Sequence, residues 1–204
     1  MGRQKTFSDD EVLEGVADVF AANGFKGTSV QMLADACGLG KQSLYNSFGD
    51  KQNLYLKALD CSAARYASVV NEMDRAPDGR SAIRLFFERV LGSCVSQDPA
   101  EQACIVSAGL LEGVADPRIS EALRGKWAYS HDVLRTAVRR GQADGSIASA
   151  DDPGELADVL MALMGGLRIN ARAVEDPKRL QKTLARVLSV LDTAPAPSRK
   201  KQPR

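Results

Sequence analysis

The chain has 204 residues, of which 44% are hydrophobic and 5% aromatic, and its formal net charge is +1 at neutral pH. A net charge this small gives no overall electrostatic field that would attract the protein to nucleic acid or to a membrane. Its function must therefore be sought in local motifs. Because no apolar run approaches the roughly 20 residues that cross a bilayer and the first residues do not form a secretory signal, we expect a cytoplasmic protein with a small and a larger helical part.

The first predicted helix begins at a capping box formed by Ser8 and Glu11 and ends at Gly24. Two short helices around the glycine turn Gly38-Leu39-Gly40 are then predicted between Thr28 and Phe48. Thr28 is the expected cap of the first of them, with Gln31 answering three residues later. The residues that helical spacing turns inward are Val30, Leu33, Ala34, Cys37, Leu44 and Phe48. The pattern is that of a helix-turn-helix.

The second of these short helices leaves a polar side outward, which we call the reading face. It consists of Lys41, Gln42, Ser43, Tyr45 and Asn46. Such a helix lies in the DNA major groove, where amide and ammonium groups suit base edges, while Tyr45 and Lys51 suit phosphates. Asp50 is the expected N-cap of the next helix, whose first amides would also face an anion. A helical hairpin that only packs is the alternative.

The first 60 residues are not a basic block, because their acidic side chains outnumber their basic ones. Long-range attraction to DNA should therefore be modest, and affinity must come from a few cations on one face, neutral donors and helix ends. Arg3 and Lys5 precede the first helix, either as an arm along the DNA or as a frayed terminus.

Turns divide the rest of the chain into further helices. The turns are Pro77-Asp78-Gly79, Gln97-Asp98-Pro99 and Ala143-Asp144-Gly145, and the helices between them are expected over about 50–74, 80–96, 100–113 and 117–141. The last two helices each begin with Asp-Pro, at Asp152 and Asp176. Both carry apolar stripes wide enough to pack on the core and on a partner, although stripes that only close the core of a monomer are the alternative.

The four cysteines, Cys37, Cys61, Cys94 and Cys104, show no metal-binding spacing, and we expect neither a metal site, a disulfide framework nor a cofactor. Residues 194–204 change to proline, serine and cations, which predicts a disordered basic tail. Such a tail either adds nonspecific DNA affinity or has no role.

The segment from Phe7 to Leu59 resembles the DNA-binding domain of the tetracycline-repressor (TetR) family of bacterial regulators. The likeness lies in its GFKGTSV turn, its LADACGLGKQSLYNSF core and its DKQNLYLKAL continuation. Beyond it, the likeness rests on helical layout and length. The resemblance implies an all-α fold of about nine helices, with a DNA-binding domain over 1–50, a ligand-binding and dimerisation domain over 51–193 and the tail. It also implies a homodimer that binds a palindromic double-stranded operator and a small-molecule effector.

The resemblance also implies residue roles. The expected DNA contacts are Thr28, Lys41, Gln42, Ser43, Tyr45, Asn46 and Lys51. The expected effector pocket is lined by Phe86, Phe87, Cys94, Cys104, Trp127, His131, Met161, Met164 and Arg168. The expected dimer bundle forms through Leu160, Met164, Gly165, Leu167, Leu184 and Leu188. Arg168 favours an acidic ligand, unless it pairs with Glu112 or Asp158.

We therefore expect a repressor that an effector releases from DNA, with activation left open. One alternative is a thiol-based repressor, because ACIVSAGLLEG around Cys104 resembles a segment in a branch of the family that senses electrophiles or oxidants; a buried, unreactive thiol is the other interpretation. A helical dimer that binds protein through the same face is a third. An enzyme is not expected, because the sequence shows no paired carboxylates, nucleophile–base pair or phosphate loop, and His131 is its single histidine.

Overall fold

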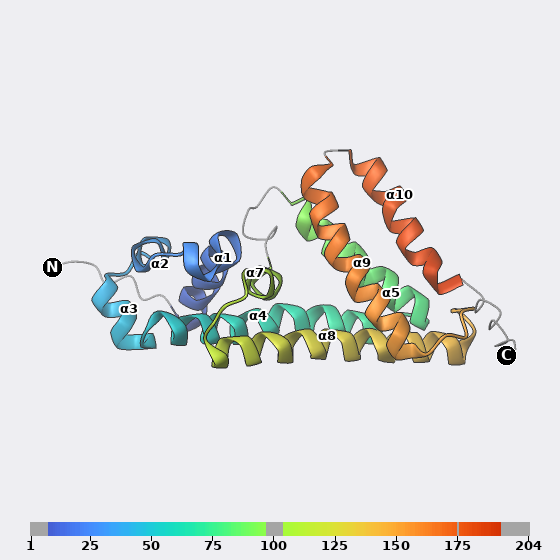
Figure 1. The fold of residues 1–204 in the computed structure, drawn as a ribbon, viewed down its shortest axis with the longest axis horizontal. Helices are drawn as coiled ribbons and strands as arrows, with labels where there is room; N and C mark the ends of the chain where they lie inside the picture. The colour runs from blue at the N-terminus through green and yellow to red at the C-terminus, as the bar shows by residue number, and fades with distance from the viewer. Residues whose placement is uncertain (1–7, 97–103, 175, 193–204) are drawn as a thin grey trace, which may run out of the picture. The chain divides into compact units, whose positions relative to one another are not determined.

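The computed structural model describes residues 8–96, 104–174 and 176–192, and these ranges are helical with no strand (Figure 1). The elements are α1 (Asp9–Gly27), α2 (Val30–Cys37), α3 (Lys41–Phe48), α4 (Lys51–Asp74), α5 (Gly79–Cys94), α7 (Ile105–Glu112), α8 (Pro117–Asp144), α9 (Pro153–Ala173), α10 (Pro177–Leu188) and the 3₁₀ turn η1 (Ser189–Asp192). The all-α fold is therefore confirmed. No helix in these ranges is long and apolar enough to span a membrane.

Three of the predicted features lie outside the described residues. These are the arm with Arg3 and Lys5, the turn Gln97-Asp98-Pro99 and the tail 194–204.

Most helices begin where local capping rules place them. The Ser8–Glu11 capping box is present, with the Glu11 amide donating to Ser8 Oγ at 3.3 Å. Aspartates that accept hydrogen bonds from first-turn amides include Asp50, Asp78, Asp116, Asp152 and Asp176. The prediction for α2 was wrong by one residue: Ser29, not Thr28, is the N-cap, because Ser29 Oγ accepts from the Met32 amide at 3.2 Å.

Helix α1 leaves the helical conformation at Gly24, where the first predicted helix was expected to end, and one further turn reaches Gly27. Gly24 has φ 72° and ψ 173°, a conformation that only glycine adopts without strain. The break in the helix therefore lies at the glycine that the sequence indicated.

The chain packs as two compact units. The first comprises Met1–Ser68 and Ser93–Tyr129, and the second comprises Val69–Gly92 and Ser130–Arg204. In the first unit, α7 packs on α1, and the first part of α8 contributes to the same core as the three N-terminal helices. The functional boundary expected near residue 50 stays a prediction, since packing groups α7 with the N-terminal helices.

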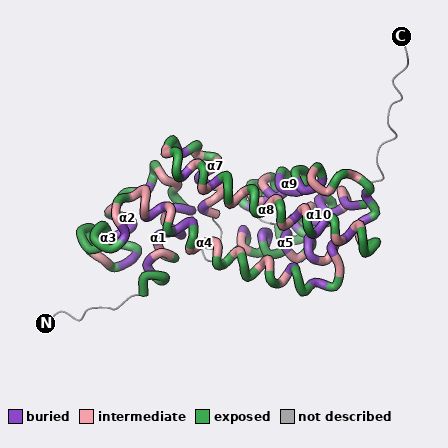
Figure 2. The backbone as a smooth tube through the Cα atoms, turned by 90° about the horizontal axis from the view of Figure 1, so that it is seen from below, coloured by how far each residue is buried: buried purple, intermediate pink, exposed green. Residues whose placement is uncertain are grey.

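The core of the first unit is built around an aromatic trio. Phe20 lies edge-on to Tyr55 with ring centroids 4.8 Å apart, and Phe25 lies edge-on to Tyr55 at 5.3 Å. Buried positions recur along the helices of this unit, with less buried positions between them (Figure 2). Burying a side chain such as Phe20 contributes about 2 to 3 kcal/mol, so these stripes hold the short helices in place.

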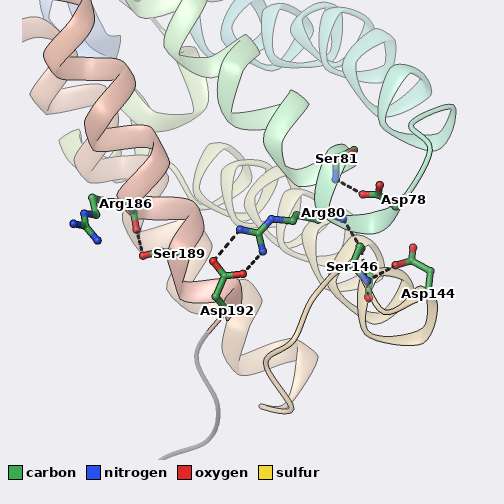
Figure 3. A network of polar contacts seen from close by, with 9 residues as sticks. Asp78, Arg80, Ser81, Asp144, Ser146, Arg186, Ser189 and Asp192 are labelled. Carbon is green, nitrogen blue, oxygen red and sulfur yellow. Dashed lines mark hydrogen bonds and ion pairs between the residues drawn. The ribbon is translucent and has the colours of Figure 1, made fainter.

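The second unit is closed by close helix contact and a polar network (Figure 3). A Cβ atom at Gly79 would lie 2.2 Å from the Gly141 amide nitrogen, so α5 approaches α8 at a distance that only glycine permits. Asp144 accepts from the amides of Gly79 and Ser146, each at 2.9 Å. The guanidinium of Arg80 pairs with both carboxylate oxygens of Asp192, which ties η1 to the start of α5.

Candidate nucleic-acid interface

Helices α2 and α3 form a helix-turn-helix. The residues on its buried side are Leu33, Ala34, Cys37, Leu44 and Phe48. Gly38 ends α2 in the left-handed region, at φ 62° and ψ 26°. The Leu39 amide then donates to the Ala34 carbonyl at 3.0 Å, which is the hydrogen bond of a glycine-terminated helix end. The turn predicted from the glycines is therefore present.

The outward side of α3 presents all five members of the reading face to solvent. Gln42 Nε2 donates to Asn46 Oδ1 at 2.9 Å, a contact between residues four apart on a helix. The pair leaves an acceptor, Gln42 Oε1, and a donor on Asn46 available to another molecule. Such a donor–acceptor pair matches the major-groove edge of a base.

Thr28 and Lys51, the two predicted DNA contacts outside α3, are more constrained. Thr28 is 2% exposed and its hydroxyl donates to the Gly24 carbonyl at 2.6 Å, so a contact with DNA would require this bond to be given up. The Lys51 ammonium lies 4.6 Å from the centroid of the Phe25 ring, a cation–π contact. Both DNA contacts stay predictions.

Partial burial lowers the pKa of Lys51, and the nearby negative charge of Glu112 opposes that shift. This carboxylate belongs to α7 and accepts hydrogen bonds from the amides of Phe25 and Lys26. Sequence reasoning missed this contact, because Glu112 is 87 positions from Phe25 and 86 from Lys26, and no local pattern links residues so far apart.

The residues expected to line an effector pocket divide between the two units. Cys104 and Trp127 belong to the first unit and are partly exposed. The members in the second unit are Phe86, Phe87, Met161, Met164, His131 and Arg168. Cys94, the last residue of α5, belongs to the first unit and is buried. That these residues line one pocket stays a prediction.

Within the second unit, some of these groups have defined neighbours. The rings of Phe86 and Phe87 are both buried and lie 5.7 Å apart, edge to face. His131 Nε2 lies 3.3 Å from the Gly154 carbonyl oxygen and 3.3 Å from Asp158 Oδ1. A pairing of Arg168 with Glu112 or Asp158 stays an open alternative.

The residues expected at a dimer interface lie mainly in the protomer's own core. Leu160, Met164, Leu167, Leu184 and Leu188 are buried, and Gly165 is partly buried. Helices α9 and α10 pack on each other within the protomer, and the part of these residues in a dimer interface stays a prediction. Exposed apolar residues of α9 include Val159, Ala162, Gly166 and Ile169. We call this set the α9 stripe.

Two family models match the chain. Residues 12–58 match the model described as bacterial regulatory proteins of the tetR family. Residues 80–193 match the C-terminal model of the BetI-type transcriptional repressor. Together they cover the helix-turn-helix and most of the remaining helices.

Curated relatives and solved structures agree. An uncharacterized HTH-type transcriptional regulator YezE from Bacillus subtilis is 28% identical over 94% of this chain and all of its own length. The HTH-type transcriptional repressor AcnR from Corynebacterium glutamicum is 41% identical over 68% of this chain and 65% of its own. A cysteine mutant of the TetR-family regulator CifR, solved with a 26 bp double-strand operator DNA, is 29% identical with a TM-score of 0.78, covering 91% of this chain and 98% of that one.

Proposed function

The chain belongs to the TetR family of bacterial regulatory proteins and is a DNA-binding transcriptional regulator rather than an enzyme; we propose that it is a homodimeric repressor, which binds a palindromic operator and leaves it when a small-molecule effector binds. The observation that carries this proposal is the reading face of α3. Its five polar side chains are exposed on a helix whose other side, through Leu44 and Phe48, is buried in the helix-turn-helix.

In this proposal α3 of each protomer enters the major groove of one operator half-site. The hydrogen-bonded amides of Gln42 and Asn46 suit the N6 and N7 positions of adenine, and Lys41 suits the O6 and N7 acceptors of guanine. Tyr45 would contact a phosphate at the edge of the groove. Each well-formed base contact discriminates against a wrong base by about 1 to 3 kcal/mol.

Contacts to the DNA backbone would be few. Lys51 lies in the first turn of α4, and acidic residues dominate the surface of α1, where Asp9, Asp10 and Glu11 occupy the first turn. Because each neutralised phosphate steepens the salt dependence of binding by about one unit, we expect a shallower dependence than that of strongly basic DNA-binding proteins.

Dimerisation would pair the α9 stripes of two protomers. Val159 is 41% exposed and Ile169 is 65% exposed, and Ala162 and Gly166 lie between them on the same helix face. Small residues between larger apolar ones let a second helix approach closely. A two-fold symmetric pair then matches the symmetry of a palindrome.

An effector would act by binding more tightly to the conformation that does not fit DNA, with a coupling of about 1 to 3 kcal/mol. The expected pocket residues of the second unit favour a ligand with an apolar body, because Phe86, Phe87 and Met164 are apolar and buried. Arg168, on the same helix as Met164, favours an acidic group on that ligand.

A thiol-based mechanism through Cys104 is a second candidate. Cys104 is the N-cap residue of α7 and is partly exposed, whereas burial raises the pKa of Cys37. Oxidation or alkylation at Cys104 would enlarge the side chain at the start of α7 and shift that helix. Loss of operator binding on treatment with an electrophile, prevented by Cys104→Ser, would favour this route over a reversible ligand.

The proposal is tested by sequencing the genomic fragments that the purified protein retains at a fixed salt concentration. We expect one palindromic site. Lys41→Ala combined with Tyr45→Phe should abolish binding to it while dimer mass and helical content stay unchanged, and Arg139→Ala, which removes an exposed cation of the second unit, should bind as the wild type does. Equal DNA affinity in the double variant and the wild type would overturn the assignment and favour protein recognition by the same face.

A further inference from the structure

Glu112, the last residue of α7, holds two backbone amides at the end of α1. Its Oε2 accepts from the Phe25 amide and its Oε1 from the Lys26 amide, both at 2.6 Å. Hydrogen bonds from amides to an ionised carboxylate are short and roughly twice as strong as neutral ones. The contact therefore joins α7 to the segment that leads into the helix-turn-helix.

The kink at Gly24 leaves backbone amides that require a hydrogen-bond acceptor, and the Glu112 carboxylate supplies it. Because Gly24 leaves the helical conformation, the amides that follow it resemble the first amides of a helix, which have no acceptor within the helix. A Cβ atom at Gly24 would lie 2.9 Å from Glu112 Oε2, so the glycine also leaves the space that the carboxylate occupies. The backbone conformation of Gly24 and its missing side chain thus both allow the Glu112 carboxylate to accept from the amides that follow the kink.

The segment held by Glu112 leads directly to predicted DNA contacts. Phe25 carries the ring over which the Lys51 ammonium lies at 4.6 Å. Lys26 is followed within two residues by Thr28, whose hydroxyl bonds to the Gly24 carbonyl, and then by the N-cap of α2. A displacement at Phe25 and Lys26 would therefore move Lys51 and the start of the helix-turn-helix together.

Helix α7 is fixed at its other end as well. The Tyr55 hydroxyl donates to the Ile105 carbonyl at 3.1 Å, in the buried core of the first unit. A Cβ atom at Gly109 would lie 2.3 Å from that hydroxyl, so α7 passes Tyr55 at a distance that only glycine permits. The position of Glu112 is thus set by the packing of the whole helix.

We propose that Glu112 is a positioning residue for operator binding, which fixes Phe25 and Lys26 and through them the Lys51 ammonium and the start of α2. The inference rests on the proposed DNA-binding role. A displacement of α7 by about 1 Å would take bonds of this length beyond hydrogen-bond range, so Glu112 fixes Phe25 and Lys26 only while α7 keeps its place.

The test compares Glu112→Gln with Glu121→Gln in operator titrations over a range of salt concentrations. Both variants remove one negative charge, but Glu121 is an exposed residue of α8 in the same unit and leaves the amides of Phe25 and Lys26 untouched. We expect Glu112→Gln to weaken operator binding about tenfold, within the range by which positioning networks alter coupling, and Glu121→Gln to bind as the wild type. The glutamine retains one acceptor oxygen, so the fold should be kept; hydrogen exchange at residues 25–28 should speed up.

A double-variant experiment tests whether Glu112 acts on operator binding through Lys51. In a Lys51→Ala background, Glu112→Gln should have a clearly smaller effect, and in the wild-type background it should reduce the salt dependence by about the share of the Lys51 contacts. If Glu112→Gln speeds exchange at residues 25–28 but binds the operator as tightly as Glu121→Gln, the residue is structural only and the inference fails. If both specific and nonspecific DNA bind more tightly, Glu112 acts only by repelling phosphate, and the inference fails again.

Failure of the proposed function looks different. In that case the wild-type protein itself retains no genomic fragment. The Glu112 inference then fails as well, because Glu112 cannot be a positioning residue for operator binding in a protein that does not bind DNA.

Discussion

At the scale of single residues, one phenol hydroxyl joins the core of the first unit to α7. Tyr55 is buried, and burial raises its pKa, with the nearby Glu112 and Cys104 adding to the shift. The hydroxyl therefore stays protonated and donates to the Ile105 carbonyl at 3.1 Å. Since the ring also packs against Phe20 and Phe25, Tyr55 joins the aromatic core of the first unit to α7 through this hydroxyl.

Removing that hydroxyl should lower the stability of the fold. Tyr55→Phe keeps the aromatic packing but leaves the Ile105 carbonyl without its side-chain donor, and such a loss costs about 1 to 2 kcal/mol. Urea unfolding followed by circular dichroism measures the difference. Tyr129→Phe is the matched control, because the Tyr129 side chain is 51% exposed; equal unfolding midpoints for the two variants would mean that the Tyr55 bond contributes nothing.

The residues that sequence reasoning identified correctly are those set by their own neighbours along the chain. Asp152 and Asp176 were predicted as helix caps because a cap and its amides are two or three positions apart. The prediction of Thr28 as the cap of α2 was wrong because the next residue, Ser29, also carries a hydroxyl, and only the backbone after the Gly24 kink decides which of them caps the helix. Glu112 was beyond reach, since its partners are brought to it by tertiary packing alone.

At the scale of elements, the start of α5 is held by carboxylates that titrate below their ordinary range. Hydrogen bonds from Ser146 and from the Gly79 amide lower the pKa of Asp144, and the bond from Arg80 lowers that of Asp192 (Figure 3). An aspartate in the unfolded chain titrates at about 3.9. Because the folded-state pKa values are lower, the stabilisation is present above that pH and is lost as the pH falls through the folded-state values.

Replacing one of these carboxylates should therefore reduce the acid sensitivity of the fold. We expect the urea midpoint of Asp144→Asn to fall less between about pH 7 and about pH 3 than that of the wild type, while its midpoint near pH 7 is lower. Asp74→Asn, which removes an exposed carboxylate at the end of α4 in the same unit, is the control. An unchanged pH dependence in Asp144→Asn would show that the polar network does not couple stability to pH.

Element boundaries and faces show where periodicity stops being informative. The helices from α7 to α10 were located by their turns and caps, but α9 is apolar on more than one side. Periodicity could not tell which apolar side faces the protomer's own core, because both sides satisfy the same spacing. Packing decides it: Leu160, Met164 and Leu167 face inward, and the α9 stripe faces solvent.

At the scale of the whole molecule, the proposed repressor depends on assembly. One reading face spans one half-site, so a palindrome is bound strongly only when two copies are held together. An exposed apolar helix face is a common site of such pairing. The affinity for the operator should then depend on protein concentration in the same range as dimer formation.

Charge placed in the α9 stripe should separate folding from assembly. Ile169→Arg introduces a cation where the native side chain is 65% exposed, so the stability of the protomer should not change. Pairing of two α9 stripes would bury that charge against a second copy, which is costly. We expect a monomer by sedimentation, an unchanged unfolding midpoint and operator binding weakened by at least about tenfold through the lost avidity. Val159→Arg, with the native side chain 41% exposed, should act alike, and Val95→Arg, at a 44% exposed position outside the stripe, should leave the dimer intact. A dimer that survives both stripe substitutions would place the subunit contact elsewhere on the chain, and the two-fold arrangement of reading faces would then have to be built from a different surface.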